Sequence, residues 1–380
     1  MTYLFENYKR APIEFVKAEG TYLIDSEGKA YLDFSSGIGV TNLGFHPQVQ
    51  RALIQQAGRI WHSPNLYLSS LQEQVAQALA GSYDYLAFFC NSGAEANEAA
   101  IKLARKATGK QGIITFQQSF HGRTFGAMAA TGQDKIKEGF GDGVPHFSYA
   151  AYNDLASVED LVNQDTAAIM LELVQGESGV RPAEASFVKV LADFCQREGI
   201  LLIVDEVQTG MGRTGQLYSF EHYGIIPDIV TLAKGLANGL PAGALLGKSR
   251  LASALGPGSH GSTFGGNKLA MAAALETLHI MKEMGFLEEV RSKSAILLEQ
   301  LQFAFQDHPK ISAVRGLGMM IGIETSASLS KIVEGARQKG LIILSAGENV
   351  IRLLPPLTIS REEIQQGIVI LKEVFSQVDE

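Results

Sequence analysis

Two apolar runs in the middle of the chain end close to groups that could do chemistry. Residues 201–204 lead into Asp205, and a second β-like run, 228–232, leads to Lys234. Short apolar runs of this kind are typical of strands buried in a parallel sheet, where functional groups gather at the carboxyl ends. An amine that forms a Schiff base and a carboxylate that keeps a pyridine nitrogen protonated are what pyridoxal phosphate (PLP) chemistry requires. On these two residues alone, a structural Asp–Lys ion pair in an ordinary α/β enzyme is the favoured explanation, because strands that end in an acid are common.

A second candidate lies between a strand-like run, residues 86–90, and a run rich in strong helix formers. The turn between them contains Ser92, Gly93 and Ala94. Backbone N–H groups at such a helix start have no partner within the helix and lie at the positive end of its dipole, which suits a phosphate. A plain helix cap at Asn91 or Ser92 is an equally good explanation.

An aromatic ring and a guanidinium follow the next strand-like run. Phe120 could lie against the face of a planar cofactor, and Arg123 could bind a carboxylate through two N–H groups. Taken singly, a core phenylalanine and a surface arginine are the commoner fates.

Two acids and a glycine-rich stretch complete the candidates. Glu172 and Glu177 lie at or just beyond the run 167–173 and could line a site, although exposed loops hold most such acids. Residues 258–267, GSHGSTFGGN, form either a second phosphate loop or a flexible linker into the following helix.

The elements that must position these residues alternate between strand and helix. We expect strands at 86–90, 112–116, 167–173, 201–205, 228–233 and 242–246, and helices at 47–57, 71–80, 91–109 and 186–197. This alternation predicts an α/β fold with a mostly parallel sheet. After about residue 250 the pattern changes to helices at 267–284, 286–306 and 361–377, with β-like runs at 319–323, 341–344 and 350–354.

We therefore expect a large domain over residues 46–250, which carries most of the candidate PLP-binding residues, and a smaller α+β domain over 251–380. The N-terminal segment, residues 1–45, contains a hairpin-like pattern and is expected to join the small domain.

Composition excludes several other kinds of protein. The chain has 380 residues, 46% of them hydrophobic, and a net charge of −8 without a basic block, which argues against nucleic acid or an anionic membrane as partner. Two cysteines, Cys90 and Cys195, are expected to be buried free thiols in a reducing cytosol. We find no signal-peptide pattern, no membrane-length apolar run and no metal-ligand spacing, and we expect a cytoplasmic enzyme.

Together the stretches resemble the class III PLP-dependent aminotransferases of fold type I, and most closely the acetylornithine aminotransferases. NSGAEANEAAIKLAR, SFHGRT, LLIVDEVQTGMGRTG, TLAKGLANGLPAGA and HGSTFGGNKLA occur in the family's order and spacing. The resemblance covers essentially the whole chain.

The resemblance implies a role for each candidate. Lys234 would hold PLP and shuttle a proton, and Asp205 would pair with the pyridine nitrogen. The other implied cofactor contacts are Ser92, Gly93 and Ala94 at the phosphate, Phe120 and Val207 at the ring, Gln208 near its 3′-oxygen, and Thr263 from the partner subunit of a homodimer. The implied substrate contacts are Arg123 at a carboxylate, Ser262, and Glu177 with Arg352 as a gate that frees the arginine for glutamate.

The implied reaction moves the δ-amino group of N2-acetyl-L-ornithine to 2-oxoglutarate, in arginine biosynthesis. Alternatives that keep this mechanism use ornithine, succinylornithine or succinyl-diaminopimelate as the amine donor. A PLP aminomutase or decarboxylase on the same scaffold is a further alternative, as is a non-catalytic ligand-binding protein.

Overall fold

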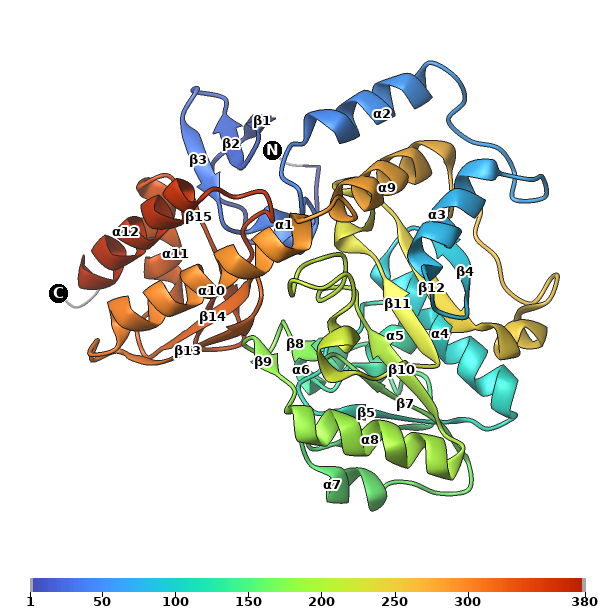
Figure 1. Ribbon diagram of the computed structural model, residues 1–380. Helices are drawn as coiled ribbons and strands as arrows, with labels where there is room; N and C mark the ends of the chain where they lie inside the picture. The colour runs from blue at the N-terminus through green and yellow to red at the C-terminus, as the bar shows by residue number, and fades with distance from the viewer. Residues whose placement is uncertain (1–2, 378–380) are drawn as a thin grey trace.

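The computed structural model describes residues 3–377, and its largest sheet supports most of the candidate residues (Figure 1). In spatial order the strands are β4 (Tyr85–Cys90), β12 (Gly243–Lys248), β11 (Ile229–Leu232), β10 (Leu201–Asp205), β7 (Thr166–Leu171), β5 (Gly112–Phe116) and β6 (Phe147–Ala150). Neighbouring strands are parallel except at β12, which is antiparallel to both β11 and β4. The expected mostly parallel α/β sheet is confirmed.

Helices cover both faces of this sheet. In β10, Leu202 and Val204 pack into one core cluster with α8 (Ala185–Glu198), whereas Leu201 and Ile203 pack into another with α4. Since successive side chains of a strand point to opposite faces, the sheet is the middle of three layers. The other helices around it are α2 (Pro47–Ala57), α3 (Ser70–Ala80), α5 (Phe125–Ala130), α6 (Asp134–Lys137), α7 (Leu155–Glu159), α9 (Lys268–Met281), η1 (Ser219–Tyr223), η2 (Lys234–Ala237) and η3 (Ser249–Leu255).

The sequence fixes both ends of α4 (Gly93–Thr108), the helix that begins at the candidate phosphate turn. The Ser92 hydroxyl accepts a hydrogen bond from the Glu95 backbone N–H at 3.2 Å and caps the helix start. At the other end Gly109 has a φ of 71°, which glycine adopts without strain, and basic residues occupy the last turn. The helix therefore begins directly after β4, at the carboxyl edge of the sheet.

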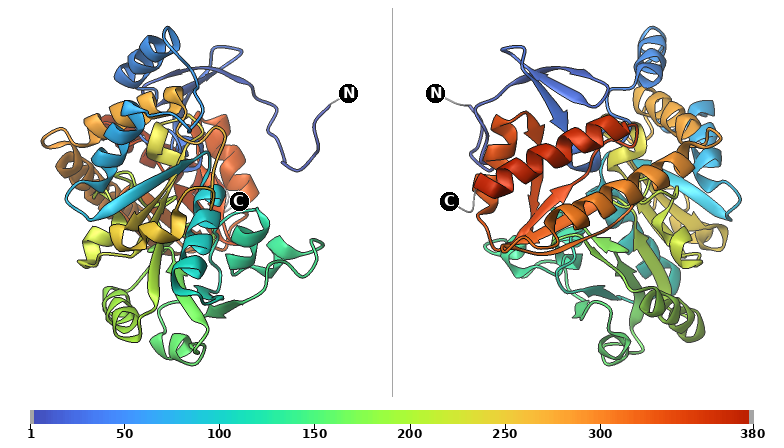
Figure 2. Two further views of the ribbon diagram at one scale, coloured as in Figure 1. Left: turned by 90° about the vertical axis from the view of Figure 1, so that its right-hand side faces the viewer. Right: turned by 60° about the vertical axis from the view of Figure 1, so that its left-hand side comes forward.

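The two ends of the chain share a second sheet. β1 (Phe15–Glu19), β2 (Tyr22–Asp25) and β3 (Ala30–Asp33) form an antiparallel meander, and β3 pairs in parallel with β15 (Leu341–Ile342). Figure 2 shows these strands beside the C-terminal helices. A third sheet has the order β13 (Ile311–Leu317), β14 (Met320–Thr325), β17 (Val350–Leu353) and β16 (Leu344–Ala346), and the helices α10 (Phe286–Phe305), α11 (Leu329–Gln338) and α12 (Arg361–Gln377) lie in the same part of the chain.

Several expected elements differ in detail. The expected strand 167–173 is divided: β7 ends at Leu171, and β8 (Val174–Gln175) pairs instead with β9 (Arg181–Pro182). The run 341–344 contributes to two different sheets through β15 and β16. β13 and α11 were not predicted.

A left-handed turn, α1 (Ser36–Gly39), precedes the large sheet. All four residues have positive φ: 44°, 59°, 68° and 73° in chain order. For Ile38 this conformation is strained, because a β-branched side chain crowds the backbone there. The turn is held by the buried Asp33, whose Oδ1 accepts from the backbone N–H groups of Ser35 and Ser36 at 2.8 and 3.1 Å, and by the Ser36 hydroxyl, which donates to Leu354 O at 2.7 Å.

Among residues 3–377, no helix has both the length and the apolar character needed to cross a membrane.

Candidate active site

Asp205 and Lys234 lie at the carboxyl ends of adjacent parallel strands, as expected. Asp205 is the last residue of β10 and is paired in register with Thr231 of β11, and Lys234 begins η2 just beyond β11. Lys234 has a φ of 43°, an uncommon conformation for a residue with a side chain, and such strain is typical of functional sites. Desolvation lowers the pKa of Lys234, and the nearby carboxylates, Glu177 foremost, oppose this only in part. A lysine with a lowered pKa is a better nucleophile toward a carbonyl.

Three donors surround the buried Asp205 carboxylate. Oδ2 accepts from Asn97 Nδ2 at 2.8 Å and contacts His121 Nδ1 at 2.7 Å, while Oδ1 accepts from the Val207 backbone N–H at 2.9 Å. Burial lowers the pKa of His121, but the hydrogen bond and charge of Asp205 outweigh it, so the net shift is upward. These contacts fix the orientation of the Asp205 carboxylate. They leave its carboxylate suited to stabilise a protonated ring nitrogen.

The start of α4 faces the same place. The backbone N–H groups of Gly93 and Ala94 belong to the first turn and have no acceptor within the helix. A Cβ atom on Gly93 would lie only 2.7 Å from Val207 Cγ1, so only glycine lets this turn approach the loop that follows Asp205.

A cavity of about 460 Å³ joins these groups. Of the candidates from the sequence, it is lined by Ser92, Gly93, Ala94, Phe120, Arg123, Glu172, Asp205, Val207, Gln208 and Lys234. Asn97 and His121 also line it. Sequence reasoning gave neither of these two a role, because one side chain lies mid-helix and the other lies within a loop motif. Asn97 could have been predicted as a site residue, because it is an amide on the same face of the helix as the candidate phosphate turn.

Phe120 and Arg123 lie together on the loop after β5. The Arg123 guanidinium lies over the Phe120 ring, 5.7 Å from its centroid, and is exposed to the cavity. The Phe120 backbone N–H donates to Glu172 Oε1 at 2.8 Å. Burial raises the pKa of Glu172 to about 7, with Asp205 adding to the effect and His121 opposing it.

Glu177 and Arg352 form an ion pair next to the cavity. Arg352 Nη1 lies 2.6 Å from Glu177 Oε1, and the arginine side chain is only 2% exposed. Arg352 comes from β17 of the C-terminal sheet, whereas Glu177 follows β8. Burial raises the pKa of Glu177, but the charges of Arg352 and Lys234 lower it by more. The net shift of this pKa is downward, and the acid is held ionised.

The remaining two candidates lie on the 258–267 loop, outside the cavity lining. Ser262 Oγ accepts from Asn91 Nδ2 at 3.1 Å and from the Gly265 N–H at 2.9 Å, which ties the loop to the start of α4. Thr263 is exposed on the surface of the chain. Within one chain, therefore, the structure does not bring Thr263 to the other candidates.

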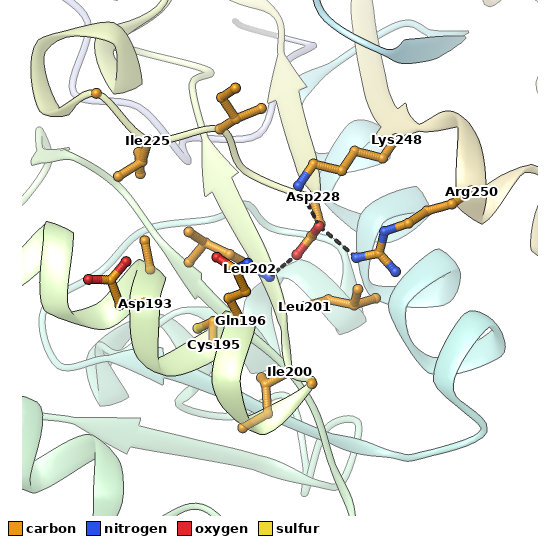
Figure 3. A pocket seen from close by; sticks show the side chains of 14 residues that line it. Asp193, Cys195, Gln196, Ile200, Leu201, Leu202, Ile225, Asp228, Lys248 and Arg250 are labelled. Atoms are coloured by element: carbon orange, nitrogen blue, oxygen red, sulfur yellow. Dashed lines mark hydrogen bonds and ion pairs between the residues drawn. The ribbon is translucent and has the colours of Figure 1, made fainter.

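A larger cavity, of about 650 Å³, lies at the opposite edge of the sheet (Figure 3). There Asp228 accepts from Lys248 Nζ at 2.9 Å, Arg250 Nη2 at 2.7 Å and the Leu202 backbone N–H at 3.0 Å. Lys248 and Arg250 are thus both paired with Asp228. The cluster joins the starts of β10 and β11 to the end of β12. We assign it a structural role.

The smaller cavity fits a phosphorylated pyridine. The α4 turn offers unpaired N–H groups and has no room for a Cβ at Gly93, Asp205 offers a carboxylate with fixed orientation, and Lys234 offers an amine of lowered pKa. This combination, on an α/β sheet, defines the site of a PLP-dependent enzyme of fold type I.

Comparison with known proteins agrees with this class. The family model "Aminotransferase class-III" matches residues 3–375. The acetylornithine aminotransferase of Streptococcus mutans is 69% identical over 99% of this chain and 100% of its own. The ornithine aminotransferase of Toxoplasma gondii, solved with partial occupancy of PLP at its active site, superposes with a TM-score of 0.94 at 30% identity, over 99% of this chain and 93% of that one. The N-acetylornithine aminotransferase of Stenotrophomonas maltophilia gives 0.85 at 34% identity, over 97% of both chains.

The chain belongs to the class III aminotransferases. It is an enzyme of the transferase class whose cofactor is PLP.

Proposed function

We propose that this enzyme transfers the δ-amino group of N2-acetyl-L-ornithine to 2-oxoglutarate, giving N-acetyl-L-glutamate 5-semialdehyde and L-glutamate in arginine biosynthesis. The 69% identity to an acetylornithine aminotransferase over nearly the full length supports this donor. The observation that carries the proposal is one exposed guanidinium that lines the cavity and one masked guanidinium beside it. Arg123 is exposed to the cavity, whereas Arg352 is buried against Glu177.

This pair of arginines suits two unlike substrates. Acetylornithine has one carboxylate, which Arg123 can bind, with a neutral amide beside it. Glutamate has two carboxylates, so it needs a second cation. An unpaired arginine in a desolvated site would be costly and would attract the wrong end of the amine donor, and pairing with Glu177 removes both problems.

The chain's own side chains would then act as follows. PLP, when bound, supplies an electron sink for the carbon that carries the reacting amino group. Lys234 Nζ would hold the cofactor, take a proton from that carbon and deliver it to the cofactor's C4′ carbon, because its lowered pKa leaves the amine free to accept. Asp205 holds a proton on the ring nitrogen, oriented by Asn97 and His121. Gly93 and Ala94 bind the phosphate through their N–H groups.

We also propose that the active form is a homodimer in which Thr263 serves the partner's site. Large apolar side chains are exposed around Thr263, with Leu66 91%, Leu68 100% and Phe264 63% exposed, and such patches mark interaction surfaces. Asn65 Nδ2 donates to Ser262 O at 3.0 Å and to Gly265 O at 2.9 Å, which ties the two segments of this patch together.

Two further statements remain our proposals. We propose a small domain made of residues 1–45 and 251–380 beside a large domain of 46–250. The pairing of β3 with β15 supports the union of the two ends of the chain, whereas α9 packs on α2 and α3 of the large domain. The two buried cysteines and the absence of a membrane-length helix among the described residues support a cytoplasmic location.

The donor is tested by steady-state kinetics with acetylornithine, succinylornithine, ornithine and succinyl-diaminopimelate, each with 2-oxoglutarate. We expect acetylornithine to have the highest kcat/KM. Preference for another donor would replace the substrate and keep the mechanism. Turnover without glutamate as a product would indicate an aminomutase or a decarboxylase.

The gate is tested by the variant Glu177→Ala. Its half-reaction with acetylornithine should slow by about tenfold or more, because Arg352 is left unpaired and competes for the donor's carboxylate. Its half-reaction with glutamate should be unchanged or faster, because Arg352 no longer has to be released. Stopped-flow spectra measure the two half-reactions separately.

A matched control is Glu324→Ala, which removes the acid of the Arg315–Glu324 ion pair on the same C-terminal sheet but outside the cavity. It should leave both half-reactions unchanged. Equal losses in the two half-reactions of Glu177→Ala would leave Glu177 as a structural acid without a gating role.

A further inference from the structure

The Gln208 side chain lies beside the Glu177–Arg352 ion pair and contacts both of its partners. Its Oε1 accepts from Arg352 Nη1 at 3.1 Å, and its Nε2 donates to Glu177 Oε1 at 3.3 Å. The backbone of Gly176 closes over the amide, since a Cβ there would lie 2.1 Å from Oε1. Gln208 itself is 7% exposed. Both ends of the amide are therefore oriented by the ion pair.

The same amide also lines the cavity that fits the cofactor. It lies one residue after Val207 and three after Asp205, on the loop that follows β10. An amide nitrogen has two N–H groups. One is used by Glu177, which leaves the other available to a group in the cavity.

We propose that Gln208 is a positioning residue that communicates the state of the Glu177–Arg352 pair to the bound cofactor. While the pair is closed, the amide is held with its second N–H directed to the ring oxygen of the cofactor. When Glu177 leaves, Nε2 loses its acceptor, the amide is free to turn, and that N–H is withdrawn. The substrate that opens the pair thus changes the cofactor before chemistry begins. This inference rests on the proposed function, because it takes the pair to be a gate.

Loss of the Glu177 charge and withdrawal of the Gln208 N–H should shift the titration of the cofactor-linked nitrogen in opposite directions. The negative charge of Glu177 raises the pKa of Lys234 directly, so its removal alone should lower the pH at which the cofactor-linked nitrogen titrates. Withdrawal of the Gln208 N–H leaves more negative charge on the ring oxygen, which binds the proton shared with that nitrogen more tightly. The route through Gln208 therefore raises the same titration pH.

A double-mutant cycle separates the two effects. Wild type, Glu177→Ala, Gln208→Met and the double variant are purified with PLP, checked for full cofactor loading, and titrated with pH by the visible absorption of the cofactor. Methionine has a similar volume to glutamine but no amide. In the Gln208→Met background, Glu177→Ala should lower the apparent pKa. In the wild-type background, the change in apparent pKa caused by Glu177→Ala should be more positive by about half a pH unit or more. Coupling of this size is expected for residues in direct contact.

The control cycle combines Glu172→Gln with Gln208→Met. Glu172 also acts on Lys234 electrostatically, but its hydrogen bond goes to the Phe120 N–H and not to Gln208. Its effect on the apparent pKa should be the same in both backgrounds. If Gln208→Met does not retain PLP, Gln208→Asn replaces it, because its amide is one methylene too short to span the pair.

A second measurement uses ligands in place of the Glu177 variant. Glutarate has the two carboxylates that open the pair, and pentanoate has only one. The shift of the apparent pKa caused by glutarate, relative to pentanoate, should be more positive in wild type than in the Gln208 variant. Strict additivity in the Glu177–Gln208 cycle, together with equal glutarate shifts, would overturn the proposal.

Failure of the inference and failure of the proposed function give different results. These titrations contain no amine donor, so they are independent of which donor the enzyme prefers. Coupling without acetylornithine turnover would retain the Gln208 inference with another donor. Normal acetylornithine and glutamate half-reactions without coupling would retain the function and remove the inference.

Discussion

Charge at the active site is controlled by a small set of buried side chains. Asp205, His121 and Glu172 are each less than 6% exposed, and the first two contact each other directly. Hydrogen bonds fix the orientation of the Asp205 carboxylate. Burial of Glu172 is offset only in part by His121, Lys234 and the Phe120 N–H, so the pKa of Glu172 is raised to about 7. Two acids in one cavity thus have different surroundings, and the raised pKa of Glu172 is typical of an active site.

This difference predicts how stability depends on pH in the cofactor-free protein. Because the folded-state pKa of Glu172 is raised from 4.5 to about 7, the folded state binds its proton more tightly than the unfolded state. The resulting stabilisation is complete below about pH 4.5 and is lost as the pH rises through about 7. Glu172→Gln should therefore gain stability relative to wild type between pH 5 and 8, by roughly 1 to 3 kcal/mol.

The measurement is urea unfolding of both proteins at fixed protein concentration across this pH range. Glutamine can still accept from the Phe120 N–H, so the comparison isolates the ionisation. A difference between wild type and variant that does not change with pH would contradict the assignment of the raised pKa to Glu172.

At the residue scale, the reactive groups could be predicted from the sequence, but the side chains that orient them could not. Asp205 and Lys234 were found because each follows a buried strand, and that position predicts the functional edge of a sheet. Asn97 and His121 act through Asp205, from a helix and a loop distant in sequence. No local periodicity reports such contacts, because they depend on how α4 and the β5–α5 loop pack over the sheet.

At the scale of elements, the regular parts of the fold were predictable because each has a strong local signal. β10 and α12 were predicted with the bounds that the structure has. The division between β7 and β8 was not predictable, since the apolar run continues while the backbone leaves the sheet to pair with β9. The short α11 was missed although Ile332 and Ala336 are buried. The edge strand β13 was missed because its residues are only partly buried.

The strain in the left-handed turn α1 leads to a prediction about Ile38, which is 42% exposed. A residue that tolerates positive φ should recover about 1 kcal/mol or more of backbone strain. Ile38→Asn should therefore cost no more stability than Ile38→Val, although asparagine loses far more apolar contact. At an ordinary half-buried isoleucine the order would be reversed.

Thermal unfolding of the two variants and wild type, loaded with PLP, measures this. Ile38→Val is the matched control because it keeps the branched Cβ and hence the strain. If Ile38→Asn were destabilised by about 1 kcal/mol or more beyond Ile38→Val, the turn would not be strained in solution.

At the scale of the whole molecule, the proposed dimer makes each site depend on two chains. Thr263→Ala should weaken PLP affinity, and Lys234→Ala should abolish transamination. When the two variant chains are mixed, one site of each mixed dimer would carry both substitutions and the other site neither. Activity should return, to at most half of that of wild type per dimer, because the intact site is complete.

The mixed dimers are isolated with two different affinity tags before the assay, and each variant alone is refolded in parallel as the control. Verified mixed dimers that remain inactive would place Thr263 in the site of its own chain. Monomers with full activity would remove the dimer from the proposed function.

The parallel pairing of β3 with β15 has a consequence for how a newly made chain folds. Leu32 is synthesised near the start and its partner Leu341 near the end, so this sheet stays incomplete until almost the whole chain has left the ribosome. The strands of the large sheet lie between them and can form earlier, with the phosphate turn, Asp205 and Lys234 already in place. Arg352 emerges last, in a strand next to the late-forming sheet. During synthesis the cofactor site can thus form before the gate that selects its substrates, and the exposed β3 edge needs protection from wrong pairing throughout that interval.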